Sequence, residues 1–210
     1  MRLNIGSGRT AIPSWTNIDR STNIMHGRVP AAKRMLNRFG LLTEDHLQPG
    51  DDMVRLDARK LPYADNSVEA IYSSHTLQHL YLHEAESVLS ECARVLKPGG
   101  ILRLALPDVE PLARQLLSGV GGAGQDAGRY FNSRLLAYPE DRPTLSGRLQ
   151  SAVGGHTNRW QASASMVRQL MIGAGLVHIY DREYRRGNLP MLDTIETRED
   201  SLFLEGTTLA

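Results

Sequence analysis

The 210-residue chain has a single cysteine, Cys92, so it lacks the thiols for an internal disulfide framework or a zinc site built on several thiolates. Aromatic residues make up only 6% of the chain, and 24 basic against 23 acidic side chains leave a formal charge of +1. This balance gives no electrostatic basis for broad nucleic-acid or membrane-surface binding. Long apolar runs are missing too, so the sequence predicts no membrane-spanning helix.

A secretion signal is also missing. The first apolar stretch breaks at Gly6, which makes it too short for a signal peptide. We therefore expect a cytoplasmic protein with one domain over residues 1–210.

What the sequence does contain is an alternation of apolar strands and amphipathic helices. Strands are expected over 2–5, 16–19, 53–57, 68–73, 101–106, 176–184 and 201–207, and helices over 30–39, 84–96, 163–173 and after Asp108. The segment Lys97–Gly100 is expected to form a turn, and the glycine-rich stretch 119–128 a mobile loop. Strands that alternate with helices through short turns indicate a mainly parallel α/β sheet.

Four strand ends carry residues suited to binding a ligand: Gly6-Ser7-Gly8, Asp19, Asp57 and Ser74-His75. In an open parallel sheet, ligands bind beyond the carboxyl ends of the strands. Glycines let a ligand approach the backbone, an acid can accept hydrogen bonds from a ribose diol, and polar groups can hold an adenine amino group. The pattern indicates an adenosine-containing ligand.

The segment Gly6–Ala11 also satisfies the dinucleotide pattern G-x-G-x-x-G/A, which would predict a nicotinamide cofactor. That pattern needs a helix whose N-terminus faces a pyrophosphate, and Pro13 with the early second strand leaves no room for one. The acid, Asp19, also follows the glycines sooner than the pattern requires. A nicotinamide-dependent oxidoreductase is therefore the disfavoured alternative.

Seven segments together resemble the class I S-adenosylmethionine-dependent methyltransferases, most closely a compact type 11-like group with a shortened first helix. They are Leu3–Gly8, Trp15–Asp19, Asp57–Pro62, Asp65–Val68, Ser74–His79, Arg94–Gly100 and Leu106–Asp108. The resemblance implies a Rossmann-like fold with an antiparallel last strand, and S-adenosylmethionine as cofactor. Two positions depart from the family pattern: Gln78 replaces an acid, and Ser7 stands where many relatives carry cysteine.

The resemblance also implies roles for individual residues. The implied cofactor contacts are Gly6, Ser7 and Gly8 at the methionine end, Asp19 at the ribose, Asp57 and Ala58 at the adenine, and Ser74 and His75 near the methyl group. Residues 20–51 and 119–160 are insertions that we expect to cover the methyl acceptor.

Methyl transfer from a sulfonium is accelerated chiefly by aligning the acceptor with the methyl group and by excluding water. A hydroxyl acceptor adds a need for a general base, for which His75 is the first candidate and His156 the second, while Asp108 could orient the acceptor. The simpler alternatives are that His75 and Asp108 only cap the helices that follow them. The spacing of His75, His79 and His83 leaves a metal site as a further alternative to ordinary histidines.

These observations predict an S-adenosylmethionine-dependent methyltransferase acting on a small molecule or glycan. By analogy with the group it resembles, we expect a sugar or other hydroxyl as the acceptor. A non-catalytic S-adenosylmethionine-binding module is the alternative. Nucleic acid and membranes are not expected as partners, and a homodimer is left open.

Overall fold

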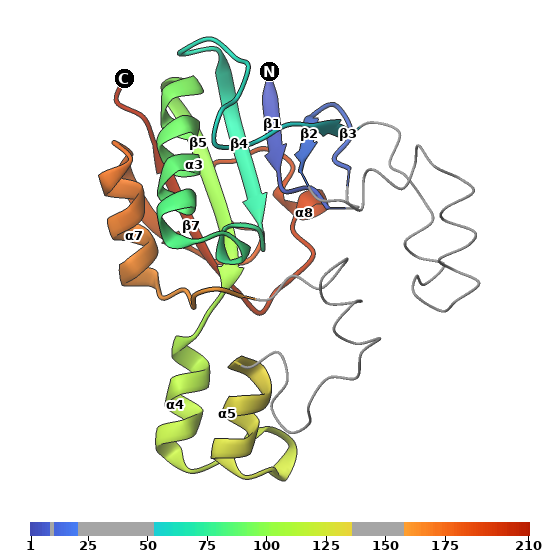
Figure 1. The fold of residues 1–210 in the computed structure, drawn as a ribbon, viewed down its shortest axis with the longest axis vertical. Helices are drawn as coiled ribbons and strands as arrows, with labels where there is room; N and C mark the ends of the chain where they lie inside the picture. Colours follow the sequence, from blue (N-terminus) through green and yellow to red (C-terminus); the bar gives the residue numbers. More distant parts are fainter. Residues whose placement is uncertain (9–10, 21–52, 136–157) are drawn as a thin grey trace, which may run out of the picture.

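The computed structural model describes residues 1–8, 11–20, 53–135 and 158–210 (Figure 1). Within these ranges, seven strands form one sheet in the order β3-β2-β1-β4-β5-β7-β6. The strands are β1 (Arg2–Ile5), β2 (Thr16–Asp19), β3 (Met53–Arg55), β4 (Val68–Ser74), β5 (Leu96–Pro107), β6 (Val177–Arg182) and β7 (Ser201–Thr207). Strands β3, β2, β1, β4 and β5 are parallel, whereas β7 runs antiparallel to β5 and β6. The expected mainly parallel sheet with an antiparallel last strand is confirmed.

The helices lie against the sheet and beyond the carboxyl ends of its parallel strands (Figure 1). They are α3 (Leu82–Val95), α4 (Glu110–Ser118), α5 (Ala127–Leu135), α7 (Ala164–Gly173) and α8 (Leu192–Ile195), with single 3-10 turns η3 (Leu77–His79) and η4 (Gly122–Gly124). The helices expected over 84–96 and 163–173 are confirmed as α3 and α7, and the one expected over 30–39 lies outside the described residues. None of the described helices is long and apolar enough to cross a bilayer.

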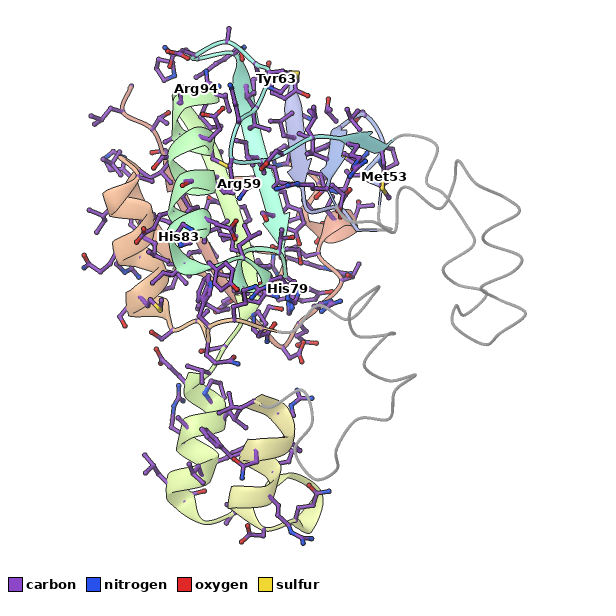
Figure 2. All side chains as sticks on the ribbon, viewed as in Figure 1. Met53, Arg59, Tyr63, His79, His83 and Arg94 are labelled. Atoms are coloured by element: carbon purple, nitrogen blue, oxygen red, sulfur yellow. The ribbon has the colours of Figure 1, made fainter. Side chains whose placement is uncertain are left out.

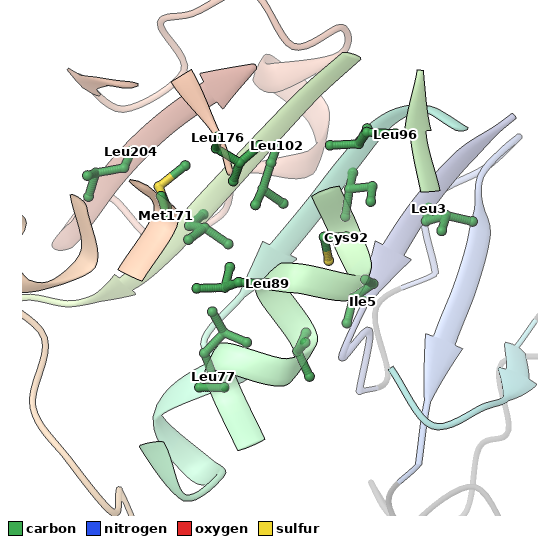
Figure 3. Close-up of a cluster of buried hydrophobic side chains, with 14 of the residues drawn as sticks. Leu3, Ile5, Leu77, Leu89, Cys92, Leu96, Leu102, Met171, Leu176 and Leu204 are labelled. Carbon is green, nitrogen blue, oxygen red and sulfur yellow. The ribbon is translucent and has the colours of Figure 1, made fainter. Parts of the chain in front are cut away.

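Helices α3 and α7 cover one face of the sheet. The buried residues of α3 recur at helical spacing, and they pack on strand residues such as Leu3 and Leu102 (Figure 3). Met171 of α7 joins the same cluster. Cys92 lies within it, and burial raises the pKa of the Cys92 thiol to about 12. This thiol is therefore part of the core and not of a reactive site.

The connection from β6 to β7 covers the opposite face of the sheet. Ala70 and Tyr72 of β4 point to this face, because side chains alternate along a strand and Ile71 belongs to the first cluster. Leu189 and α8 pack on them, together with Ile12 and Trp15 from the β1–β2 connection. The described residues between β1 and β2 form no helix, in agreement with the shortened first helix that the sequence predicts.

A buried asparagine organises the short β1–β2 connection in place of that helix. The Asn17 amide donates to the carbonyls of Ile12 and Trp15 at 3.1 and 3.2 Å. Its carbonyl oxygen accepts from the Ile12 N–H at 2.8 Å and from the Asn4 amide at 2.9 Å. These four hydrogen bonds satisfy the polar backbone of a buried turn.

The segment Lys97–Gly100 is not the turn outside the sheet that its composition predicts. Strand β5 begins at Leu96, which pairs with Val68, and the next pair joins Ile101 to Ala70. The four intervening residues therefore bulge from the ladder, and Gly99 adopts the left-handed φ of +73° that such an irregularity requires.

The glycine-rich stretch 119–128 connects α4 and α5. Gly119 ends α4 with a φ of +72°, and a single antiparallel bridge joins Val120 to Asp126. The segment thus has backbone pairing of its own, and its mobility stays a prediction. Most of the first proposed insertion, and residues 136–157 of the second, lie outside the described residues.

Candidate functional site

The turn after β1 is fastened to the end of β2. The N–H groups of Gly6 and Ser7 donate to the Ile18 carbonyl at 2.7 and 3.1 Å, and the Gly8 N–H donates to Asp19 Oδ2 at 2.6 Å. Gly6 and Gly8 have left-handed φ values of +71° and +55°. Two left-handed residues in three turn the chain sharply, so the carboxyl end of β1 presents backbone and not side chains.

The end of β4 closes this turn from the other side. Thr76 Oγ1 donates to the Gly6 carbonyl at 3.2 Å, and a Cβ on Gly6 would overlap Oγ1 and Cγ2 of Thr76. Position 6 therefore has no room for a side chain. The structure thus brings the Gly6–Gly8 turn, Asp19 and the Ser74–Thr76 segment together, as the strand order predicts.

The two departures from the family pattern have separate surroundings. Ser7 is buried, and its Oγ donates to the Ile18 carbonyl at 3.4 Å, so the hydroxyl supports the same turn. Gln78 is also buried, and its Oε1 has no hydrogen-bond partner in the part of the chain that the structure describes.

Asp57, expected at the adenine, is engaged by two arginines. Its carboxylate accepts from Arg59 Nη2 at 2.7 Å and from Arg20 Nη1 at 2.9 Å. The hydrogen bond from Arg59 is the main reason that the pKa of Asp57 falls to about 2. Arg59 also pairs with Glu84 of α3, so this group ties the segment after β3 to a helix. The adenine contact of Asp57 and Ala58 stays a prediction.

His75 follows β4 in a left-handed conformation, with a φ of +50°. Its N–H donates to the Ala105 carbonyl at 2.8 Å, and its ring contacts Arg198 Nη1 through Nδ1 at 3.1 Å and Ser201 Oγ through Nε2 at 2.8 Å. A guanidinium can only donate, so Nδ1 is the acceptor and the ring proton of a neutral imidazole sits on Nε2. Left-handed φ values at non-glycine residues often mark functional sites.

The His75 ring is also held neutral. Burial, and next the positive charge of Arg198, lower the pKa of His75 from 6.5 to about 4, while Asp200 acts in the opposite direction. Both ring nitrogens are then occupied, and no lone pair is left to accept a proton from an acceptor. This geometry favours a positioning role for His75, and the base role expected from the sequence stays a prediction.

We expect the His75 ring to titrate near pH 4 in the folded protein, with no transition between pH 5 and 8. Because the unfolded chain binds this proton first, at about pH 6.5, stability contributed by the neutral ring is lost as the pH falls from 6.5 through 4. Nitrogen-15 NMR of labelled histidine, assigned with a His75→Gln variant, measures the midpoint. A midpoint above 6 would contradict the arrangement.

The other candidates are Asp108, His156, His79 and His83. Asp108 Oδ1 accepts from the Glu110 N–H at 3.0 Å at the start of α4. Its role in orienting an acceptor stays a prediction. His156 lies outside the described residues. His79 belongs to η3 and His83 to α3, so they do not share one helix face (Figure 2). The described residues contain no group of three or more side chains that could hold a metal ion.

Sequence reasoning missed the residues that hold His75. Arg198 and Ser201 lie 123 and 126 positions away and meet His75 only because β7 returns beside β5. One signal was present in the sequence, since Arg103 interrupts the apolar run of β5. A charged residue inside a buried strand implies an ion pair, and Arg103 Nε contacts Glu196 Oε1 at 2.8 Å. Glu196 precedes Arg198 in the same connection.

Comparison with protein families matches residues 3–104 to a family described as a methyltransferase domain. A curated relative, the ubiquinone/menaquinone biosynthesis C-methyltransferase UbiE of Desulfotalea psychrophila, is 31% identical over 140 residues, which cover 67% of this chain and 52% of the relative. The Klebsiella pneumoniae protein of the same name is 30% identical over 129 residues, or 55% of this chain and 50% of that one. This chain spans about half the length of the curated relatives it matches.

Solved structures share the fold at low sequence identity. A methyltransferase structure from Methanosarcina mazei aligns with a TM-score of 0.53 and 15% identity, over 99% of this chain and 92% of that one. One from Thermotoga maritima, described as a possible histamine N-methyltransferase, aligns with a TM-score of 0.50 and 19% identity, over 99% and 81%. At these identities the likeness concerns the fold alone.

Proposed function

We propose that this chain is a class I S-adenosylmethionine-dependent methyltransferase and that it transfers a methyl group from S-adenosylmethionine to a small molecule. The match of residues 3–104 to a methyltransferase domain and the 31% identity to a C-methyltransferase support this proposal. The supporting observation is the Gly6–Gly8 turn with its hydrogen bond to the buried Asp19 carboxylate. Such a turn offers bare backbone to a ligand, and an acid at the end of β2 suits a ribose diol. The described part of the β1–β2 connection has no helix to face a pyrophosphate, which disfavours a nicotinamide cofactor.

The proposed chemistry depends on placement more than on proton transfer. When bound, S-adenosylmethionine supplies a methyl group on a sulfonium, a reactive electrophile. The chain's own residues would hold the cofactor at the β1 and β2 ends and keep water from its methyl group, with Ser74 and His75 beside it. A rigid, neutral His75 fits this role, because both of its ring nitrogens are held by hydrogen bonds.

The sequence led us to expect a sugar or other hydroxyl as acceptor, and that expectation stays a prediction. Two observations weigh against it: the His75 ring has no free lone pair, and the names of the curated relatives describe carbon methylation. We therefore propose acceptors that are nucleophilic without a histidine base, such as an activated ring carbon or a phenolate. Cytoplasmic location, dimer formation and a glycan substrate stay predictions as well.

Helices α4 and α5 are proposed as part of the acceptor cover. They pack on each other beyond the carboxyl ends of β4 and β5 (Figure 1). None of the residues of α4 is buried, and Leu117 is 86% exposed. A helix pair with little burial, joined to the sheet just after β5, is suited to move when a small molecule binds.

Calorimetry with S-adenosylmethionine, S-adenosylhomocysteine and NAD tests the proposal directly. We expect both S-adenosyl compounds to bind and NAD not to bind. A methyl-transfer screen over phenols, activated ring carbons and sugars then separates an enzyme from a module that only binds the cofactor. Binding of NAD alone would contradict the assignment of the β1–β2 end.

Replacing Asp19 by alanine is expected to weaken binding of S-adenosylhomocysteine by roughly 1–3 kcal/mol, because the ribose loses a charge-assisted partner and the Gly8 N–H loses its acceptor. Asp19→Asn keeps an acceptor for Gly8 and should fall between wild type and Asp19→Ala. The matched control is Asp181→Ala, which removes an exposed carboxylate of β6 that pairs with Arg168 of α7. Equal affinity in all folded variants would contradict the ribose role.

A further inference from the structure

We infer that Arg198 binds an anionic oxygen-bearing group, a carboxylate or a phosphate, of the methyl acceptor. This inference rests on the proposed function and names the class of acceptor. It concerns a residue that the sequence pattern did not single out and that reaches the site only through the fold.

Arg198 lies on the β7 side of His75, away from the β1 and β2 ends where the cofactor is proposed to bind. Ser201, three residues later, pairs with Pro107 and thus lies at the carboxyl end of β5. The strand order β2-β1-β4-β5-β7 puts the Gly6–Gly8 turn and Asp19 on one side of β4, and the start of β7 on the other. Adjacent strands are about 4.8 Å apart, so two spacings separate β4 from β7. Arg198 approaches His75 from that second side.

The guanidinium of Arg198 has donors to spare. Its Nη1 donates to the neutral His75 ring, and the side chain is exposed. Within the described residues, no carboxylate lies at ion-pair distance from it, whereas Arg59 pairs with two carboxylates and Arg168 with one. A guanidinium has five N–H groups, and its planar fork matches a carboxylate or phosphate in two parallel hydrogen bonds.

The same connection holds Arg198 firmly. Two residues before it, Glu196 is fully buried and pairs with Arg103 of β5 at 2.8 Å. Three residues after it, the Ser201 hydroxyl accepts the Nε2 proton of His75 at 2.8 Å. His75 thus fixes the guanidinium from one side while the backbone is anchored on both. A cation held in place before binding loses little conformational freedom when an anion arrives.

The charges around this group are mixed, since Glu199 and Asp200 follow Arg198 in the sequence. Arg198 and His79 lower the pKa of His75, whereas Asp200 raises it. Asp200 nevertheless lies beyond ion-pair distance of the guanidinium. An acceptor that arrives with its own negative charge would therefore meet an available partner on the β7 side of the site.

The test uses benzoate and phenyl phosphate as probes, with neutral benzamide for comparison, at constant ionic strength. The readout is the nitrogen-15 shift of His75 Nδ1, which accepts from Arg198 and is expected to respond when the guanidinium binds an anion. We expect a saturable shift with at least one of the two anions. Neutral benzamide should bind at least about tenfold more weakly than that anion. The tighter of the two anions identifies the group as carboxylate or phosphate.

Three variants complete the experiment. Arg198→Gln should abolish the saturable shift, and the matched control Arg168→Gln, at an arginine of α7 that pairs with Asp181, should keep it. Arg198→Lys should retain part of the affinity for the anion, because an ammonium keeps the positive charge but cannot make two parallel hydrogen bonds as a guanidinium does. No saturable shift in the wild-type protein, or an equal shift in Arg198→Gln, would overturn the inference.

Binding of S-adenosylhomocysteine separates this inference from the proposed function. Arg198→Gln should bind it as wild type does. A loss of about tenfold would mean that the anion is the cofactor's own carboxylate, which overturns an acceptor role. The anion titrations are run with and without S-adenosylhomocysteine. A wild-type protein that binds no S-adenosylhomocysteine contradicts the proposed function, while the titrations without it still decide whether Arg198 binds anions.

Discussion

Replacing Arg103 by methionine is expected to lower the free energy of unfolding by about 3–5 kcal/mol, because the buried Glu196 carboxylate loses its cation and Glu205 keeps only Arg182. Arg103 is fully buried, with Nε 2.8 Å from Glu196 and Nη1 3.5 Å from Glu205. Its Nη1 and Nη2 also donate to the carbonyls of Arg186 and Glu183 at 2.7 and 3.0 Å. The side chain therefore fastens the β6–β7 connection to the sheet at three points, and its contact with Glu205 adds a link to β7.

Urea denaturation of the full chain measures this cost. The matched control is Arg114→Met, which breaks an exposed pair with Glu110 at 3.6 Å and should cost less than about 1 kcal/mol. Adding Glu196→Gln to Arg103→Met should recover part of the loss, because one stranded charge is then removed. Equal costs for Arg103→Met and Arg114→Met would contradict the importance of the buried group.

Alanine at position 6 is expected to weaken S-adenosylhomocysteine binding by about 100-fold, combining the cost of a left-handed alanine with that of overpacking. Gly6 has a φ of +71°, and a Cβ would overlap the Thr76 side chain. Thr76 would have to give up its hydrogen bond to the Gly6 carbonyl. The turn that faces the proposed cofactor would then lose its support from β4.

The matched control for this variant is Gly119→Ala. Gly119 has a φ of +72°, almost the same as Gly6, but no atom lies within 4 Å of its ideal Cβ position. We expect a stability cost of about 1 kcal/mol there and no change in ligand affinity. Calorimetry with S-adenosylhomocysteine, on variants shown to be folded by circular dichroism, makes the comparison. Similar affinities for Gly6→Ala and wild type would show that the turn tolerates a side chain.

Much of the sheet follows from local patterns in the sequence. Strands β1 and β7 have the bounds expected from apolar residues flanked by turn formers, and α3 follows from apolar residues at helical spacing. The meeting of the Gly6–Gly8 turn with Asp19 follows from topology, since the carboxyl ends of neighbouring parallel strands share one edge.

The contacts that sequence reasoning missed are long-range or depend on register. Nothing local to His75 indicates that Arg198 will approach its ring, because this contact depends on how β7 docks on β5. Glu196 likewise lies 93 positions from Arg103, in a connection without periodicity. The Lys97–Gly100 segment was misjudged for a different reason, since its composition predicts a turn while the pairing of β4 with β5 continues past it.

The buried cysteine has a practical consequence for experiments on this chain. Cys92 is its single thiol, it lies in the core between α3 and the sheet, and burial holds its pKa near 12. A thiol reagent can therefore modify the protein only when α3 opens away from the sheet. The rate of labelling at Cys92 reports this opening in the native sequence, without an introduced probe, and slowing of the reaction by added S-adenosylhomocysteine would give a ligand-binding assay.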